Sequence, residues 1–96
     1  MDKKENIKRI REKIDQIDSE ILNLLSKRKD LVTDIVRFKR RDQNIDQDRI
    51  KAILDRLDSE AKKRGIPDNL VRDLWGVMIN SFISYEEDIF DQKQKK

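Results

Sequence analysis

The sequence predicts an all-α fold in which a long, a short and a second long helix follow one another in a single domain at 1–96, ordered at about 5–91. Three observations support this fold class. The first 64 residues contain neither Gly nor Pro, whereas an all-β chain needs such turn residues every ten residues or so. Charged residues make up 45% of the chain and aromatic residues 5%, which leaves few side chains for a spherical core. Apolar residues recur at steps of three and four, the period of one helical face.

The first helix is predicted from about Lys4 to Lys39. Its apolar face is interrupted only at position 28 and comprises Ile7, Ile10, Ile14, Ile17, Ile21, Leu24, Leu31, Ile35 and Phe38. At 1.5 Å per residue this helix is about 50 Å long, which exceeds the ~30 Å width of a globule of this chain length. A monomer would leave much of the face in water, so we expect a second copy of the chain to cover it in a homodimer.

The second helix is predicted over about 47–64, after a loop at 40–48 that has no apolar period. Asn44, Asp46 and Asp48 are its candidate N-caps, because their side chains can accept hydrogen bonds from the first free N–H groups of a helix. Arg49 would then be a cation in the first turn. Gly65 stands where a left-handed residue would end the helix.

The third helix is predicted to follow Pro67 and Asp68, a helix-starting residue and a candidate N-cap. Large apolar residues at helical spacing carry it to about Asp91. We expect the remaining residues, 92–96, to fray, because chain ends without packing partners are poorly ordered.

The composition narrows the possible chemistry. The chain contains no His and no Cys, which excludes disulfides, zinc fingers and thiol or imidazole catalysis, and leaves carboxylates, cations and hydroxyls. No apolar run approaches the 18 or so residues of a membrane span, and the start of the chain lacks a signal-peptide core, so we expect a cytoplasmic protein without a membrane partner. Residues 1–41 have a net charge of +5. Acidic residues are interspersed among the basic ones, and aromatic residues are not interleaved with them, which argues against a nucleic-acid partner.

Three cations border the apolar face of the first helix. Arg28 lies on the face itself, and Arg11 and Lys39 flank it. Arginines bind carboxylates bidentately and a lysine adds a point charge, so the group could form an anion site. Alternatively, Arg28 only fixes the register or oligomeric state, while Arg11 and Lys39 extend toward water.

Distances along the helix constrain the anion site. Arg28 and Lys39 are ~16 Å apart along the axis, so two long side chains can converge on one small molecule. Arg11 lies ~25 Å from Arg28 by the same rise and cannot reach the same ligand from the same helix. If all three residues serve one site, Arg11 must come from an antiparallel partner subunit.

Glu86 is placed on an apolar stripe of the third helix, at helical spacing from Trp75, Ile79 and Phe82. Its neighbours Glu87 and Asp88 should face water. An inward carboxyl group is either paired with a cation or desolvated as a neutral acid that can donate a hydrogen bond. A frayed helix end would instead leave Glu86 solvated.

These residues together resemble the all-α class of chorismate mutases, a family that includes the related isochorismate-pyruvate lyases. The resemblance spans about 7–90 and rests on the order and spacing of Ile10-Arg11-Glu12-Lys13-Ile14-Asp15, Ile17-Asp18, Leu24-Leu25-Ser26-Lys27-Arg28, Phe38-Lys39, Asp48-Arg49 and Glu86. It implies an intertwined dimer of three-helix chains that converts chorismate to prephenate with no cofactor and no metal.

The resemblance also implies roles for individual residues. Arg11 of the neighbouring subunit and Arg28 would bind the two carboxylates of the substrate. Lys39 and Glu86 would contact its ether oxygen. Asp46 would bind the ring hydroxyl group, and Arg49 would add positive potential.

The sequence departs from the family pattern near the expected site. The loop between Lys39 and Arg49 is about two residues shorter than in the best-known members, Phe82 replaces a small polar residue, and Ile50 stands where many members have Glu. The lyases often carry an aliphatic residue at this last position. An isochorismate-pyruvate lyase is therefore the alternative on the same scaffold, and a non-catalytic helical dimerisation module is the alternative from a different class.

Overall fold

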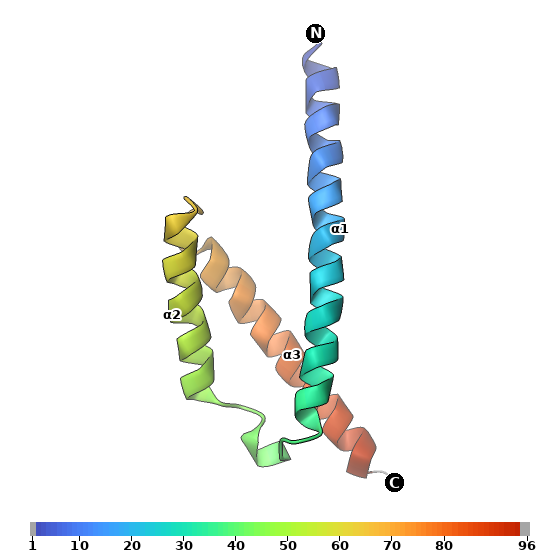
Figure 1. Cartoon of the computed structure of the whole chain (residues 1–96), viewed down its shortest axis with the longest axis vertical. Helices are drawn as coiled ribbons and strands as arrows, with labels where there is room; N and C mark the ends of the chain where they lie inside the picture. Colours follow the sequence, from blue (N-terminus) through green and yellow to red (C-terminus); the bar gives the residue numbers. More distant parts are fainter. Residues whose placement is uncertain (1, 95–96) are drawn as a thin grey trace. The chain divides into compact units, whose positions relative to one another are not determined.

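The structure, a computed structural model, describes residues 2–94, and its regular elements are helices joined by short connecting segments (Figure 1). Its elements are α1 (Lys3–Val36), the short 3-10 helix η1 (Arg41–Gln43), α2 (Gln47–Lys63) and α3 (Leu70–Gln94). No strand occurs among the described residues. The predicted all-α class and the order of long, short and long helices are therefore confirmed.

The chain divides into two units, Met1–Leu31 and Val32–Lys96. The described part of the first unit is most of α1 and contains no buried residue. The second unit contains the last turns of α1 together with η1, α2 and α3. The apolar side chains that the structure buries all belong to the second unit: Val36, Ile53, Ala61, Val71, Ile79 and Phe90.

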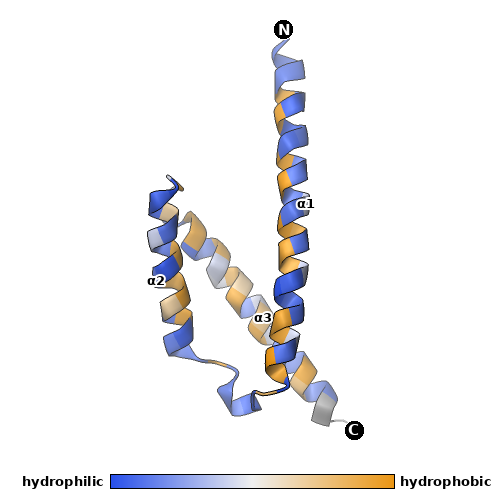
Figure 2. Ribbon diagram, viewed as in Figure 1, coloured by the Kyte–Doolittle hydropathy of each residue, from blue (hydrophilic) through white to orange (hydrophobic). Residues whose placement is uncertain are grey.

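The predicted apolar face of α1 is present but is not covered within the first unit. Apolar residues alternate with polar ones along the helix in Figure 2. The isoleucines and leucines of the face, from Ile7 to Leu31, are each 47% to 64% exposed. Helices gain most of their stability from packing of such a face, and the first unit by itself does not supply that packing.

α1 ends at Val36, three residues before the predicted end at Lys39. The amide groups of Arg37 and Phe38 donate to the carbonyls of Asp34 (3.1 Å) and Ile35 (2.9 Å), three residues back, which is the tighter pattern of a closing turn. Lys39 therefore lies in the connecting segment rather than on the helix. The predicted loop that follows contains η1.

α2 and α3 pack against each other and form the body of the second unit. Ile53 and Ala61 of α2 and Val71, Ile79 and Phe90 of α3 are all 9% exposed or less. At the surface, Arg72 of α3 donates to the carboxylate of Asp58 (2.9 Å from Nε) and to that of Asp55 (3.4 Å) on α2. These ion pairs tie the two helices together outside the core.

The turn between α2 and α3 follows from local sequence. Gly65 has φ +67°, as predicted for a left-handed cap. The N–H groups of Gly65 and Ile66 donate to the carbonyls of Lys62 (3.2 Å) and Ala61 (3.0 Å), which is the hydrogen-bond pattern of a Schellman motif. This cap satisfies carbonyl groups that the end of α2 would otherwise leave unpaired.

The ends of α3 differ from their predicted positions. The helix begins at Leu70, two residues after the expected cap Asp68, because Asn69 adopts φ +70° directly before it. Asn tolerates this left-handed conformation better than most residues. The helix continues to Gln94, three residues beyond the predicted end at about Asp91, and residues 95–96 lie outside the described part. The fraying expected for 92–96 stays a prediction. None of the described helices combines the length and apolar character that a membrane crossing requires.

Candidate active site

Lys39 and Glu86 form an ion pair inside the second unit. The Lys39 ammonium nitrogen lies 3.5 Å from Oε1 of Glu86, and it donates a hydrogen bond of 3.0 Å to the backbone carbonyl of Asn44. The two side chains are only 20% and 9% exposed. A partly buried charge pair experiences less screening by water than a surface pair, so its field acts more strongly on a bound molecule.

The position of Glu86 follows from the phase and the length of α3. Ile79 and Phe90 lie on the same buried stripe, and the helix continues beyond both of them to Gln94. The alternative in which Glu86 is solvated at a frayed end is therefore wrong. Glu87 and Asp88 are exposed, as predicted.

Asp46 and Arg49 lie at the start of α2. Asp46 is the N-cap, and its Oδ1 accepts a hydrogen bond of 3.0 Å from the backbone N–H of Arg49. This contact selects Asp46 from the three candidate caps. Both side chains are exposed, and within residues 2–94 no hydrogen bond or ion pair joins them to Lys39 or Glu86. Their contact with a substrate remains a prediction.

Arg11 and Arg28 belong to the first unit. Arg11 is exposed, and Arg28 is half-buried. Both stand on the uninterrupted helix α1, so their separation along its axis is the ~25 Å expected from the helical rise. The two arginines therefore cannot reach one small ligand from the same α1 helix, and their sharing a site across two subunits remains a prediction.

Sequence reasoning missed a role for Asn44 beyond its candidacy as an N-cap. Asn44 is 5% exposed, and its side-chain amide donates to the carbonyl of Ile83 on α3 (3.3 Å). Its own carbonyl accepts from Lys39, as described above. Apolar periodicity cannot show that a residue outside a helix is buried. The sequence offered only one indication of a role for Asn44, an amide side chain a few residues from Lys39.

A hydroxyl pair was also missed. Thr33 near the end of α1 and Tyr85 on α3 share a hydrogen bond of 2.8 Å. The ring of Tyr85 packs edge to face against Phe82, with centroids 6.3 Å apart. These contacts fix the last turns of α1 on α3 one residue before Glu86.

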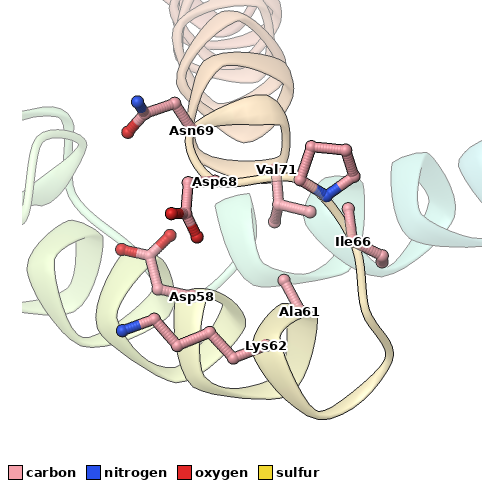
Figure 3. A pocket seen from close by; sticks show the side chains of 8 residues that line it. Asp58, Ala61, Lys62, Ile66, Asp68, Asn69 and Val71 are labelled. Carbon is pink, nitrogen blue, oxygen red and sulfur yellow. The ribbon is translucent and has the colours of Figure 1, made fainter.

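A cavity of about 300 Å³ lies elsewhere, at the turn between α2 and α3 (Figure 3). The carboxylates of Asp58 and Asp68 point toward one another there, and Lys62 extends beside Asp58. Arg72 already pairs with Asp58. Because none of the expected site residues lines this cavity, we do not place the active site in it.

Comparisons with known proteins agree with the resemblance found in the sequence. The family model described as chorismate mutase type II matches residues 10–87. A chorismate mutase of Methanocaldococcus jannaschii is 28% identical over 95 residues, which cover 96% of this chain and 95% of that protein. No solved structure matches the chain. With most of its length matched by that family model, the chain belongs to the chorismate mutase type II family.

Proposed function

We propose that this isomerase, a chorismate mutase by its family, rearranges chorismate to prephenate in a site made of cations and one carboxyl group. The observation that carries the proposal is the buried pair of Lys39 and Glu86, 3.5 Å apart. These are the two residues that the resemblance assigns to the ether oxygen. Both come from one chain, although they are 47 positions apart in sequence.

The reaction suits a site without a nucleophile. In the rearrangement one C–O bond breaks and one C–C bond forms within a single molecule, so no proton transfer, metal or covalent intermediate is needed. The rate rises when the enolpyruvyl group is held over the ring and when negative charge growing on the ether oxygen is stabilised. Cations and one hydrogen-bond donor are enough for both tasks.

Lys39 supplies the charge. Its ammonium group has three N–H donors, and within the described residues Asn44 and Glu86 provide acceptors for two of them. The third donor can reach the ether oxygen of a bound substrate. Because that oxygen becomes negative mainly in the transition state, Lys39 should act on the chemical step more than on binding.

Glu86 supplies the second contact to the ether oxygen. A carboxyl group can donate a hydrogen bond only in its protonated form, whereas an ionised carboxylate would repel the developing negative charge. In the proposed role Glu86 would donate this hydrogen bond, as the amide of a glutamine at the same position could.

Arg11 and Arg28 would bind the two carboxylates of chorismate, one arginine from each subunit of a homodimer. The exposed apolar face of α1 supports the dimer, because a second chain can cover it. The separation of the two arginines on one helix supports an antiparallel partner as the source of Arg11. Asp46 would bind the ring hydroxyl through acceptor capacity that its N-cap bond does not use, and Arg49 would add positive potential.

A two-substrate assay tests the function. Chorismate loss is followed by ultraviolet absorbance, and the products formed from chorismate and from isochorismate are identified. We expect prephenate from chorismate and no salicylate from isochorismate. Salicylate and pyruvate as the main products would assign the lyase reaction instead, and inactivity of the folded dimer on both substrates would indicate a dimerisation module.

Subunit mixing tests the shared site. Arg11→Ala and Arg28→Ala chains should each be inactive, and a heterodimer should regain one complete site of its two. After complete exchange of equal amounts, activity should return to about a quarter of the parent value, because half of the dimers are mixed. Demonstrated exchange without any recovery would contradict a site shared between subunits.

A further inference from the structure

Asn44 is buried where its neighbour is not. Apart from Lys39, the other residues of the connector between α1 and α2 are exposed, and even the apolar side chain of Ile45 is 54% exposed, whereas polar Asn44 is 5% exposed. Hydrophobic burial alone would favour the opposite arrangement of these two residues. The burial of Asn44 therefore has a polar cause.

The contacts of Asn44 close a ring around the Lys39 ammonium group. The side-chain amide of Asn44 donates to the carbonyl of Ile83 (3.3 Å), and its backbone carbonyl accepts from Lys39 (3.0 Å). Lys39 in turn contacts Glu86, which lies one helical turn after Ile83 on α3. The ring thus joins the connector, Lys39 and α3 through one residue.

The burial of Asn44 has a cost that these contacts do not remove. Its side-chain oxygen, Oδ1, is buried and has no hydrogen-bond partner among the described residues. A buried acceptor without a partner lowers stability relative to an apolar group of the same shape. The Asn44 side chain therefore does not maximise the stability of the fold. What it supplies are the N–H donor to Ile83 and the backbone carbonyl that accepts from Lys39.

We infer that Asn44 is a positioning residue for the reaction, holding the Lys39 ammonium group at a fixed place against α3 and Glu86. The inference rests on the proposed role of Lys39 at the ether oxygen. A lysine side chain has four rotatable carbons, so a charge aimed at one developing oxygen must be held by neighbouring acceptors. Asn44 provides one acceptor and anchors it to α3, which leaves one N–H of Lys39 directed at the substrate.

The test replaces Asn44 by Leu, which is of similar size and has neither the donor nor the unpaired oxygen. We expect Asn44→Leu to lower kcat about tenfold, within the hundredfold that a displacement of ~1 Å can cause, with KM little changed. The melting temperature should stay equal or rise. A merely structural role predicts the reverse, a lower melting temperature with an unchanged kcat per folded dimer, and that result would overturn the inference.

Gln43→Leu is the control, because it also replaces an amide side chain of the connector by Leu, at an exposed position, and removes a different hydrogen bond of the connector, the one that Gln43 accepts from the Arg40 N–H (2.9 Å). Its kcat should equal that of the parent. An equal loss of kcat in Gln43→Leu would show a general effect of the connector and would overturn a specific role for Asn44.

A double-mutant cycle separates this inference from the proposed function. In a Lys39→Ala background, Asn44→Leu should cause no further loss of kcat, because the group that it positions is absent. A full additional loss would overturn the inference. If Lys39→Ala lowers kcat and Asn44→Leu alone does not, the inference fails and the proposed role of Lys39 stands. If Lys39→Ala leaves kcat unchanged, both fail.

Discussion

The two units of this chain carry similar apolar patterns with different results. In residues 32–94 the apolar residues are covered within one chain, where α2 and α3 pack on each other and bury side chains such as Ile53 and Ile79. In residues 2–31 the pattern is as regular, yet Ile14 and Ile17 stay about half exposed, at 49% and 54%. The proposed homodimer would explain this difference, because a second chain can cover a face that the first unit does not cover by itself.

The comparison also separates the proposed site into two parts. Lys39 and Glu86 already contact each other in the self-packed unit. Arg11 and Arg28 stand on the first unit, whose apolar face the proposed partner chain would cover. Assembly and chemistry can therefore be disturbed one at a time, and the variants below do so in order of decreasing effect.

The largest effect is expected from Ile17→Asp, which places a carboxylate on the exposed face of α1. If a second chain covers this face, the buried charge is strongly unfavourable and the dimer and its activity are both lost. Sedimentation and circular dichroism measure the assembly. Gln16→Asp introduces the same residue one position earlier, off the face, and should behave as the parent. A dimeric, active Ile17→Asp protein would show that the face is not covered.

Lys39→Ala should affect the chemistry and spare the assembly. We expect kcat to fall about a hundredfold or more, the usual result of removing a donor that stabilises transition-state charge, while sedimentation still shows the dimer. Lys63→Ala, at an exposed position near the end of α2, is the control and should retain full activity. A change confined to KM would assign Lys39 to ground-state binding.

Glu86→Gln should have a smaller effect, because it keeps the size of the side chain and a hydrogen-bond donor. A glutamine amide always carries N–H donors, whereas an ionised carboxylate carries none, so kcat/KM of the variant should equal or exceed that of the parent. Glu87→Gln, at the exposed neighbour, should retain the parent activity. A kcat/KM far below that of the parent in Glu86→Gln would exclude Glu86 as the donor.

The smallest effect is expected at the surface ion pairs of Asp55, one with Lys51 within α2 and one with Arg72 on α3. A hydrogen bond from Lys51, together with Arg72, lowers the pKa of Asp55 below its usual 3.8. A carboxyl group with a lowered pKa in the folded state stabilises the protein above its unfolded-state pKa, and this contribution is lost as pH falls through the folded-state value. The melting temperature of the parent should therefore exceed that of Asp55→Asn slightly at neutral pH, and the difference should disappear in strong acid.

The ion pairs of Asp55 belong to the second unit alone. Because Asp55, Lys51 and Arg72 belong to one chain, the difference in melting temperature should not depend on protein concentration, whereas the stability of the α1 face should depend on it. Added salt should reduce the difference, since the pairs are exposed. A difference that persists unchanged at low pH would contradict the assigned ionic origin.

Much of the fold could be predicted because its causes are local. The spacing of apolar residues located all three helices, and Gly65 and Asp46 cap α2 through atoms within a few residues of them. The same phase placed Glu86 on the stripe of Ile79 and Phe90, and the absence of His and Cys limited the chemistry to charges and hydroxyls.

The sequence by itself thus determined the helical class, the caps and the residue types of the site, since these depend on neighbours along the chain. Only the tertiary structure decided that α1 stops before Lys39, that Glu86 is buried and paired rather than solvated, and that Asn44 is buried against Ile83. The pairing of Glu86 and the burial of Asn44 depend on contacts with groups 47 and 39 positions away in sequence. The end of α1 depends on where a closing turn satisfies the last free carbonyl groups of the helix. Such contacts leave no period in the sequence, because they are set by how the helices pack.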